Sequence, residues 1–130
     1  MSKVSTKENI VIVGGGLGGA AVAKELSGKL DHSKYNLIVV EARPYLVYMI
    51  GGARMAVTTE KGSLDEYLLR YDDLFTSGNV TVKNAKVEKI IPNRDGNGGE
   101  LQIRSSGGNP EPLPYRCASY ISIAIVHILI

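Results

Sequence analysis

The positions of hydrophobic and polar residues divide the first part of the chain into three predicted elements. Residues Asn9–Val13 and Leu37–Glu41 are short, mostly aliphatic runs, typical of strands that are buried on both faces of a parallel sheet. Between them, Leu17–Leu30 has its apolar residues at helical spacing, and a polar connection follows at 31–36. The helix residues able to face the sheet are Leu17, Ala20, Ala21, Val22 and Leu26. The pattern predicts a β-α-β unit of ordinary size.

The middle of the chain has a less regular pattern. Residues 42–57 have no clean period and contain Pro44 and a Gly-Gly pair, which favours loop and short helical pieces. Ser63–Phe75 is predicted as an amphipathic helix. Ser63 and Glu66 form a capping box at its start, and the apolar residues that follow share one face.

A β-hairpin is predicted further along the chain. We expect strands at 80–82 and 86–91, with a bend at Asn84 and Ala85 between them. A turn rich in Asp-Gly and Asn-Gly leads into a returning strand at 101–105. Residues 105–114 are predicted as a loop.

The turn between the first strand and the helix contains the motif G-x-G-x-x-G, and each motif glycine has a separate physical role. Gly14 permits the tight turn, Gly16 lets a diphosphate approach the backbone, and Gly19 lets the helix pack closely on the strand. The helix N-terminus adds unpaired N–H groups and the positive end of its dipole. The candidate phosphate-binding residues are therefore Gly14, Gly15, Gly16, Leu17, Gly18 and Gly19.

Glu41 is the second candidate feature of this site. It lies 22 residues after Gly19, at the carboxyl end of the second strand, where a carboxylate can accept hydrogen bonds from an adenosine ribose. The same charge would repel a 2′-phosphate, so NADP is disfavoured here. The motif leaves both NAD and FAD open, and its alternative explanation is a glycine-rich turn without a ligand.

The composition argues against a nucleic-acid-binding protein, a disulfide-bonded protein and a metalloprotein. With 130 residues, of which 44% are hydrophobic and 22% charged, the chain is typical of one globular domain. A net charge of +2, with 15 basic and 13 acidic residues interspersed, argues against a nucleic-acid partner. The single Cys117 excludes an internal disulfide, and no metal-ligand spacing appears, so no metal site is expected.

The two ends of the chain bear on location. The first residues carry no apolar core like that of a secretory signal. The apolar stretch Cys117–Ile130 is 14 residues long, whereas a helix that crosses a bilayer needs about 20. We therefore expect no membrane association, and a cytoplasmic location by default.

The stretches "VIVGGGLGGAAVAKEL" and "LIVVEARPYLVYMIGGARMAV" resemble the start of the flavoproteins similar to apoptosis-inducing factor, including the NAD(P)H–quinone oxidoreductases. The likeness continues through "NVTVKNAKVEKI" to "LPY" at Leu113–Tyr115. The resemblance implies the FAD-dependent pyridine nucleotide oxidoreductase family. It also implies an α/β, Rossmann-like FAD/NAD(P)-binding domain, with three layers, a parallel sheet and an added β-hairpin or meander.

Three further cofactor-binding residues follow from the resemblance alone. Arg54, in an Ala-Arg setting after the second strand, is expected to contact FAD, and Arg43 to cover the adenosine. Val87 is expected to meet the adenine through its backbone. With the glycine turn and Glu41, these residues complete the candidate site, and no residue is nominated as catalytic.

After "LPY" the chain departs from the family pattern. The family continues with an acid, an apolar strand and an Ala-Thr-Gly turn, followed later by a second glycine motif that holds NAD(P)H; this sequence reads "RCASYISIAIVHILI". We therefore expect residues 1–116 to be the N-terminal part of the FAD/NAD(P)-binding domain, incomplete at its C-terminus. Residues 117–130 are expected to be a divergent apolar tail. Its segment Tyr120–Val126 is predicted to act as a surrogate strand beside the first strand, in a 3-2-1-4 sheet order.

These features predict the FAD-binding portion of a flavin oxidoreductase that passes electrons from NAD(P)H through FAD to a quinone-like acceptor. The alternative is a non-catalytic adenine-nucleotide-binding module. A third hypothesis is a Rossmann-type NAD enzyme without flavin, which the predicted hairpin and the Ala53-Arg54 loop disfavour.

Overall fold

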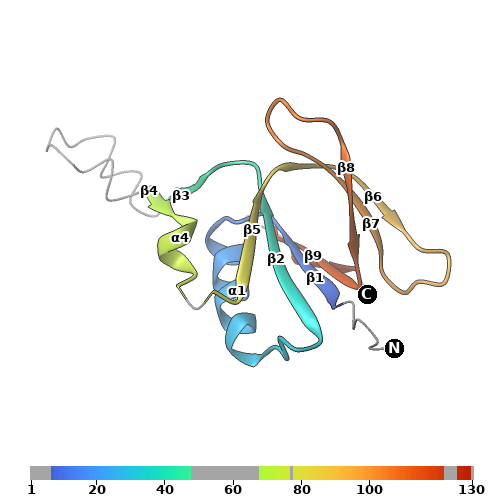
Figure 1. Ribbon diagram of the computed structural model, residues 1–130, viewed down its shortest axis with the longest axis horizontal. Coiled ribbons are helices and arrows are strands. Elements are labelled where there is room, and N and C mark those ends of the chain that lie inside the picture. Colours follow the sequence, from blue (N-terminus) through green and yellow to red (C-terminus); the bar gives the residue numbers. More distant parts are fainter. Residues whose placement is uncertain (1–6, 48–67, 77, 122–125, 130) are drawn as a thin grey trace, which may run out of the picture.

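The computed structural model describes residues 7–47, 68–76, 78–121 and 126–129, and a five-stranded sheet forms the centre of this part of the chain (Figure 1). Its strands are β1 (Glu8–Val13), β2 (Tyr35–Glu41), β5 (Val80–Asn84), β9 (Cys117–Ile121) and β10 (Val126–Leu129). They lie in the order β10-β9-β1-β2-β5; β9, β1, β2 and β5 are parallel, and β10 is antiparallel to β9. The predicted strands at Asn9–Val13 and Leu37–Glu41 are confirmed.

Helix α1 (Leu17–Lys29) covers one face of this sheet. Its buried residues are Gly19, Ala20 and Ala23, and Ala23 packs with Ile12, Leu37 and Val39 of the strands. The helix is confirmed, but part of its predicted face is wrong, because Ala21 is exposed and Leu17 and Val22 are 48% and 37% exposed. Ala20 and Ala23 face the sheet because small residues allow the closest approach of helix and strand, and Leu26 packs beside them, partly buried. Only Leu17, Ala21 and Val22 of the predicted face are turned outward.

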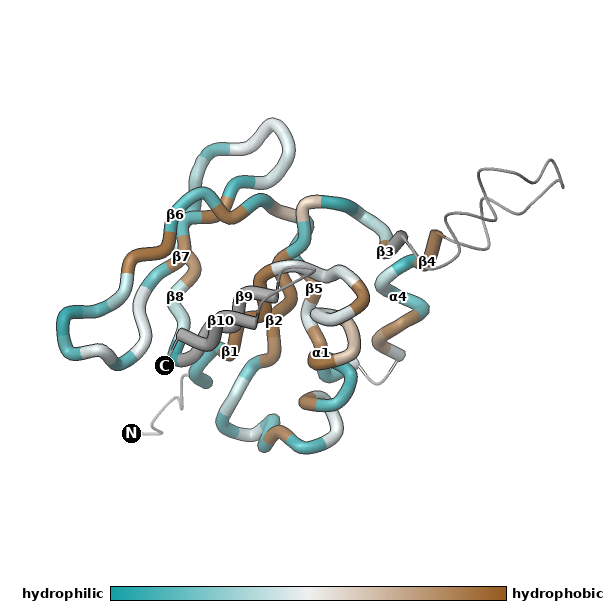
Figure 2. Tube along the Cα trace, turned by 180° about the vertical axis from the view of Figure 1, so that it is seen from behind, coloured by the Kyte–Doolittle hydropathy of each residue, from teal (hydrophilic) through white to brown (hydrophobic). Residues whose placement is uncertain are grey.

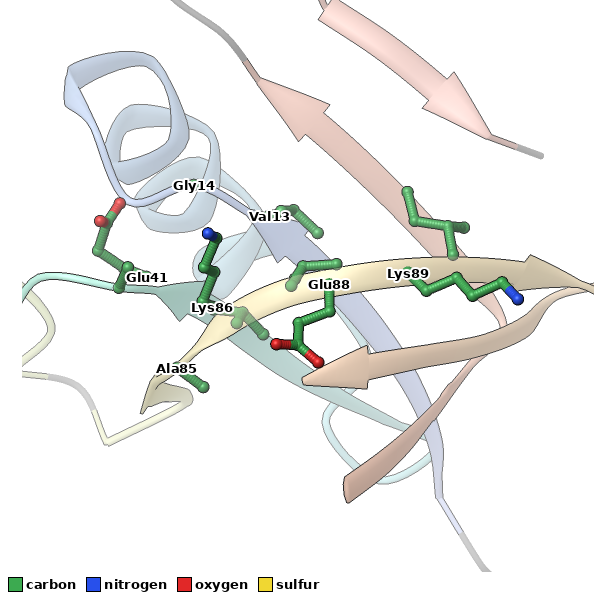
Figure 3. Close-up of a pocket in the computed structure, with 11 residues that line it drawn as sticks. Val13, Gly14, Glu41, Ala85, Lys86, Glu88 and Lys89 are labelled. Atoms are coloured by element: carbon green, nitrogen blue, oxygen red, sulfur yellow. The ribbon is translucent and has the colours of Figure 1, made fainter. Parts of the chain in front are cut away.

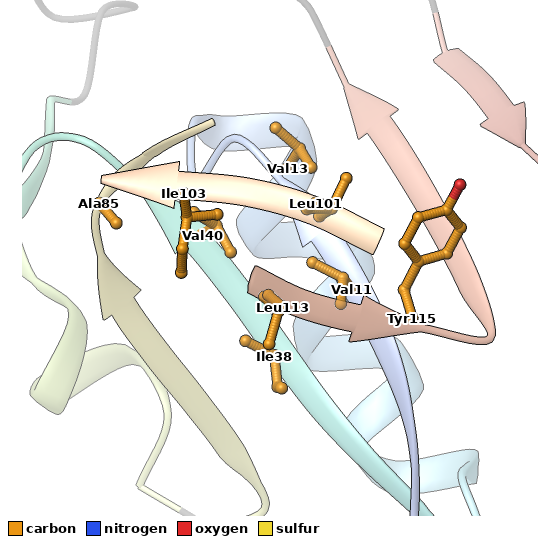
Figure 4. Close-up of a cluster of buried hydrophobic side chains, with 9 residues drawn as sticks. All are labelled: Val11, Val13, Ile38, Val40, Ala85, Leu101, Ile103, Leu113 and Tyr115. Carbon is orange, nitrogen blue, oxygen red and sulfur yellow. The ribbon is translucent and has the colours of Figure 1, made fainter. Parts of the chain in front are cut away.

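A second, three-stranded antiparallel sheet covers the opposite face. It consists of β6 (Lys86–Pro92), β7 (Gly99–Arg104) and β8 (Glu111–Tyr115), in that order. Figure 4 shows Leu101, Ile103 and Leu113 pointing toward the valines and the isoleucine of β1 and β2. The whole cluster is Val11, Val13, Ile38, Val40, Ala85, Leu101, Ile103, Leu113 and Tyr115.

The second sheet confirms the predicted hairpin and corrects the predicted loop at 105–114. Glu111–Tyr115 is a strand, in which Leu113 and Tyr115 are buried while Pro112 and Pro114 are exposed. Because proline is disfavoured in strands, the alternation of buried and exposed residues in Glu111–Tyr115 does not predict a strand from the sequence. They are tolerated because β8 pairs only with β7, so it is an edge strand in which a missing N–H breaks no ladder.

The predicted helix Ser63–Phe75 is wrong over half of its described part. Residues 63–67 lie outside the described residues, Leu68–Arg70 forms strand β4, and helix α4 spans only Tyr71–Leu74. Strand β4 pairs antiparallel with β3 (Tyr45–Val47). This pairing partner is more than twenty residues away along the chain, so local helical periodicity could not reveal it.

The position beside β1, which we expect Tyr120–Val126 to fill, is taken by β9, three residues earlier in the chain. The Cα partners run from Ile10↔Cys117 to Val13↔Tyr120. Two contacts to Asn9 guide the chain into this register: Arg116 N–H donates to the Asn9 carbonyl at 2.8 Å, and the Asn9 side chain donates to the Pro114 carbonyl at 2.9 Å. Residues 122–125 lie outside the described residues, and Val126 begins β10.

The hydropathy of the residues differs between the buried strands and the exposed turns (Figure 2). Strands β1 and β2 of the central sheet are coloured mostly as hydrophobic, and the hairpin turns of the second sheet as hydrophilic or intermediate. Within the described residues, no helix has the length and apolar character needed to cross a membrane.

A proline in β9 tests its central position. Because β9 lies between β1 and β10, Ser119→Pro removes a ladder hydrogen bond and leaves a carbonyl without its donor. We expect the free energy of unfolding, measured by urea denaturation, to fall by at least about 2 kcal/mol.

Ser106→Pro is the matched control. Ser106 is the second residue of a turn closed by a 2.9 Å hydrogen bond from Gly108 N–H to the Ser105 carbonyl, and Gly107 has a φ of 73°. This is the geometry of a type II turn, in which proline is favoured at that position. Equal losses of stability in the two variants would contradict the central placement of β9.

Candidate functional site

The glycine turn between β1 and α1 combines two positions that require glycine with one that is open. Gly14 has a φ of 97°, and its N–H donates to the Val40 carbonyl at 2.9 Å. A Cβ added at Gly19 would overlap the carbonyl oxygen of Gly14, so the helix and the turn touch backbone to backbone. Gly16, by contrast, is the N-cap of α1, and an added Cβ there would meet nothing within 4 Å. The space above Gly16 is therefore available to a ligand.

The start of α1 offers donors next to this open space. The N-cap Gly16 makes no side-chain capping bond, and the first turn contains no acidic residue. Leu17 and Gly18 are exposed at this end of the 13-residue helix. The first N–H groups of a helix have no intrahelical acceptor, and the helix dipole is positive there, so an anion is favoured at this position.

The Glu41 carboxylate lies against the turn rather than free in the solvent. It is 8% exposed, and its Oε2 accepts a hydrogen bond from Gly15 N–H at 2.7 Å. Its Oε1 accepts one from Arg43 N–H at 3.1 Å and lies 3.6 Å from the Arg43 Nε. Since an ionised carboxylate offers about four acceptor sites, capacity for a ligand's hydroxyl groups remains.

Tyr71 is a site residue that the sequence did not reveal. It comes from α4, is 5% exposed, and its hydroxyl donates to the Gly15 carbonyl at 2.6 Å. Burial, and secondly the nearby Glu41 charge, raise the pKa of Tyr71 to about 12. In the sequence this residue reads only as part of an apolar helix face, and no local signal links it to a turn 56 residues earlier.

A cleft of about 400 Å³ opens beside the turn, between the two sheets (Figure 3). One side is formed by residues 13–14 and 40–42 at the carboxyl ends of β1 and β2, and the other by residues 85–90. In Figure 3 the Glu41 and Lys86 side chains both extend toward the side of the cleft where Gly14 lies. The carboxyl ends of parallel strands are the usual position of ligand sites in open α/β sheets.

The strand on the second side of the cleft presents backbone groups. β6 is the edge strand of its sheet, so alternate residues turn their N–H and C=O groups away from β7. The pairing with β7 shifts between Val87 and Lys89, which is a β-bulge at Glu88. Val87, predicted as a backbone contact, thus lines the cleft where the ladder is irregular.

The structure brings together most, but not all, of the predicted site residues. Gly14, Glu41 and Val87 line the same cleft, and Gly14 continues through Gly15 and Gly16 into helix α1. Arg43, 58% exposed at its side chain, lines a neighbouring cavity of about 470 Å³ instead. Arg54 lies outside the described residues. Among the residues that the structure describes, no group of three His, Cys, Asp or Glu side chains could hold a metal ion.

Comparison with known proteins gives the same fold. No family model matches the chain. Apoptosis-inducing factor homolog B of Dictyostelium discoideum is 35% identical over 74 residues, which are 57% of this chain and 17% of that protein. Sulfide:quinone oxidoreductase of Aquifex aeolicus superimposes with a TM-score of 0.68 at 22% identity, over 87% of this chain and 24% of that one.

Two further solved structures have a similar fold. NDH2 of Plasmodium falciparum has a TM-score of 0.65 at 17% identity, over 88% of this chain and 22% of that one. CoADR-RHD of Bacillus anthracis has a TM-score of 0.60 at 24% identity, over 88% of this chain and 20% of that one. The chain thus spans between 17% and 24% of the length of these proteins.

The chain is similar in sequence to part of an apoptosis-inducing factor homolog, and it shares its fold with part of the sulfide:quinone oxidoreductase and NDH2 structures. The resemblance inferred from the motifs and the α/β, Rossmann-like fold class are both confirmed.

The close contact at Gly19 can be tested with two glycines of the same helix. Gly19→Ala places a methyl group on the Gly14 carbonyl, and overpacking of this kind costs about 1–3 kcal/mol of unfolding free energy. Gly28→Ala adds a methyl group in open space and removes glycine's extra backbone entropy, so a gain of about 0.5 kcal/mol is expected. Urea denaturation measures both; a neutral Gly19→Ala would rule out the contact.

The raised pKa of Tyr71 predicts a pH dependence of stability. The folded state favours the protonated hydroxyl, whose pKa is about 12 against an ordinary 10.0. This contribution is complete below pH 10 and is lost as the pH rises toward 12. The unfolding free energy should therefore fall more steeply over that range in the wild-type protein than in Tyr71→Phe, as measured by urea denaturation at several pH values. Parallel pH profiles would show that the hydroxyl is not held in this way.

Proposed function

We propose that this chain binds the adenosine diphosphate part of FAD and is the FAD-binding portion of an NAD(P)H-dependent flavin oxidoreductase. The observation that carries the proposal is the convergence of three features on one cleft: the glycine turn, which lines it at Gly14, the buried Glu41, and the edge strand β6 at Val87. The relatives' names support it. They include a sulfide:quinone oxidoreductase, and NDH2 has been solved in complex with NADH.

In this proposal each predicted residue has a definite task. The diphosphate lies over Gly16 against the first N–H groups of α1, where no Cβ stands in the way. Glu41 accepts hydrogen bonds from the ribose hydroxyls with the acceptor sites that Gly15 and Arg43 leave free. The Val87 backbone meets the adenine, and Arg43 covers the adenosine from the side of the second cavity. The resemblance also assigns Arg54 to FAD.

The residues of this chain bind and orient, and the bound flavin supplies the redox chemistry. In the complete enzyme we propose electron transfer from NAD(P)H through FAD to a quinone-like acceptor. Residues 1–116 belong to the FAD/NAD(P)-binding domain in this view, and 117–130 is a divergent segment whose first strand serves as the fourth parallel strand.

Gly16→Val tests the proposal, because the fold does not require glycine at this position. Its φ of −63° and ψ of −175° are accessible to any residue, and an added Cβ has free space. The two methyl groups would occupy the path of the diphosphate. We expect the dissociation constant for FAD, measured by flavin fluorescence titration, to rise at least about 30-fold, equivalent to about 2 kcal/mol.

Gly28→Val carries the same substitution at the opposite end of α1, also in open space, and should leave the affinity unchanged. Equal FAD binding by both variants and the wild-type chain would exclude diphosphate binding at Gly16. A chain that binds NAD but takes up no FAD would instead support a nicotinamide-binding protein without flavin. Uptake of adenine nucleotides alone, with no NADH oxidation after addition of FAD, would support the non-catalytic module.

A further inference from the structure

The middle glycine of the turn is held from both sides by side chains. The Gly15 N–H donates to Glu41 of β2 at 2.7 Å, and the Gly15 carbonyl accepts from the Tyr71 hydroxyl at 2.6 Å. Both hydrogen bonds are buried, and they come from elements that follow the turn by 26 and 56 residues. The peptide groups on either side of Gly15 are therefore fixed in the described structure by contacts from outside the glycine motif.

Tyr71 is placed for this contact by packing as well as by its hydroxyl. A Cβ added at Gly15 would lie 2.5 Å from the Tyr71 hydroxyl oxygen, so the tyrosine occupies the space above that glycine. The ring stacks on Phe75, with centroids 6.3 Å apart and an angle of 8° between the planes. It is also buried with Ala20 of α1 and Leu46 of β3. The hydroxyl is thus carried on a ring that has little freedom to move.

A fixed turn matters because glycines are the residues that lose most conformational freedom on ordering. Gly14 and Gly15 without outside contacts would sample many arrangements, and only some would align the helix N-terminus with a diphosphate. Contacts that select one arrangement before binding reduce the entropy that the ligand must remove, which tightens binding. The Tyr71 hydroxyl does not need to touch the ligand to have this effect.

We propose that Tyr71 is a positioning residue that pre-organises the glycine turn for the diphosphate. Together with Glu41 it forms a clamp on Gly15, defined here as the hydrogen bonds Tyr71–Gly15 and Glu41–Gly15. The inference rests on the proposed function and assigns a role to a residue outside the glycine motif and outside the cleft lining.

The test uses Tyr71→Phe in the full chain, a variant that keeps the ring and its stack on Phe75 while removing the donor. Amide hydrogen exchange of the ligand-free protein is measured first. Exchange at Gly15, whose N–H is bonded to Glu41, should accelerate about 3- to 10-fold, whereas the β1 amides from Ile10 to Val13 should exchange as in the wild type. Unchanged exchange at Gly15 would overturn the inference without any ligand.

Binding is measured next, with FAD, ADP and adenosine as probes. Tyr71→Phe should weaken FAD and ADP about 3- to 10-fold, because both carry the diphosphate, and leave adenosine unchanged. A general loss of stability would weaken all three probes alike, so the difference between ADP and adenosine identifies positioning of the phosphate site. Equal weakening of adenosine overturns the inference, as does unchanged affinity for FAD.

Tyr115→Phe is the control, because it removes a hydroxyl from another buried tyrosine, in the cluster between the two sheets. Its exchange at the glycine turn and its affinities should match the wild type. If the wild-type chain itself takes up neither FAD nor ADP, the proposed function is wrong and the inference falls with it. If the wild type binds both and Tyr71→Phe binds them equally, the inference alone is wrong.

Discussion

The contact on which the site depends is the hydrogen bond from Gly15 N–H to the buried Glu41 carboxylate. It joins the end of β2 to the turn that follows β1, and so connects the two strands at the place where their carboxyl ends meet the cleft. A buried carboxylate is costly unless its oxygens are satisfied, and here both accept backbone N–H groups. The same residue therefore stabilises the turn and keeps acceptor sites available beside it.

Packing on the two faces of the central sheet explains why this turn is held so closely. On one face, Ala23 lets α1 approach Ile12 and Val39, and Gly19 brings the helix into backbone contact with Gly14. On the other face, aliphatic residues of β7 and β8 cover Val11 and Val40. Both faces of β1 are buried along its last three residues, so the strand end that carries the turn has little room to shift.

The second sheet also shapes the cleft. Its edge strand β6 begins directly after Ala85, whose N–H donates to the Glu41 carbonyl at 3.0 Å. The chain therefore passes from the central sheet into β6 at the level of Glu41, which sets the bulge at Glu88 opposite the glycine turn. A cleft between the glycine turn at Gly14, which leads into α1, and a partly unpaired strand edge suits a ligand with phosphates at one end and a hydrogen-bonding base at the other.

The sequence by itself determined the elements whose signals are local. The aliphatic runs of β1 and β2, the glycine turn, α1 and the hairpin of β6 and β7 were all predictable, because strand alternation, glycine spacing and turn residues are written over a few neighbouring positions. Tertiary structure alone decided the pairing of β4 with β3, the strand character of the proline-containing β8, and the choice of small residues for the buried face of α1. It also decided that Tyr71 reaches Gly15 and that Glu41 binds the turn. These contacts join residues distant in the chain, and their free energy depends on burial and geometry that exist only once the layers have packed.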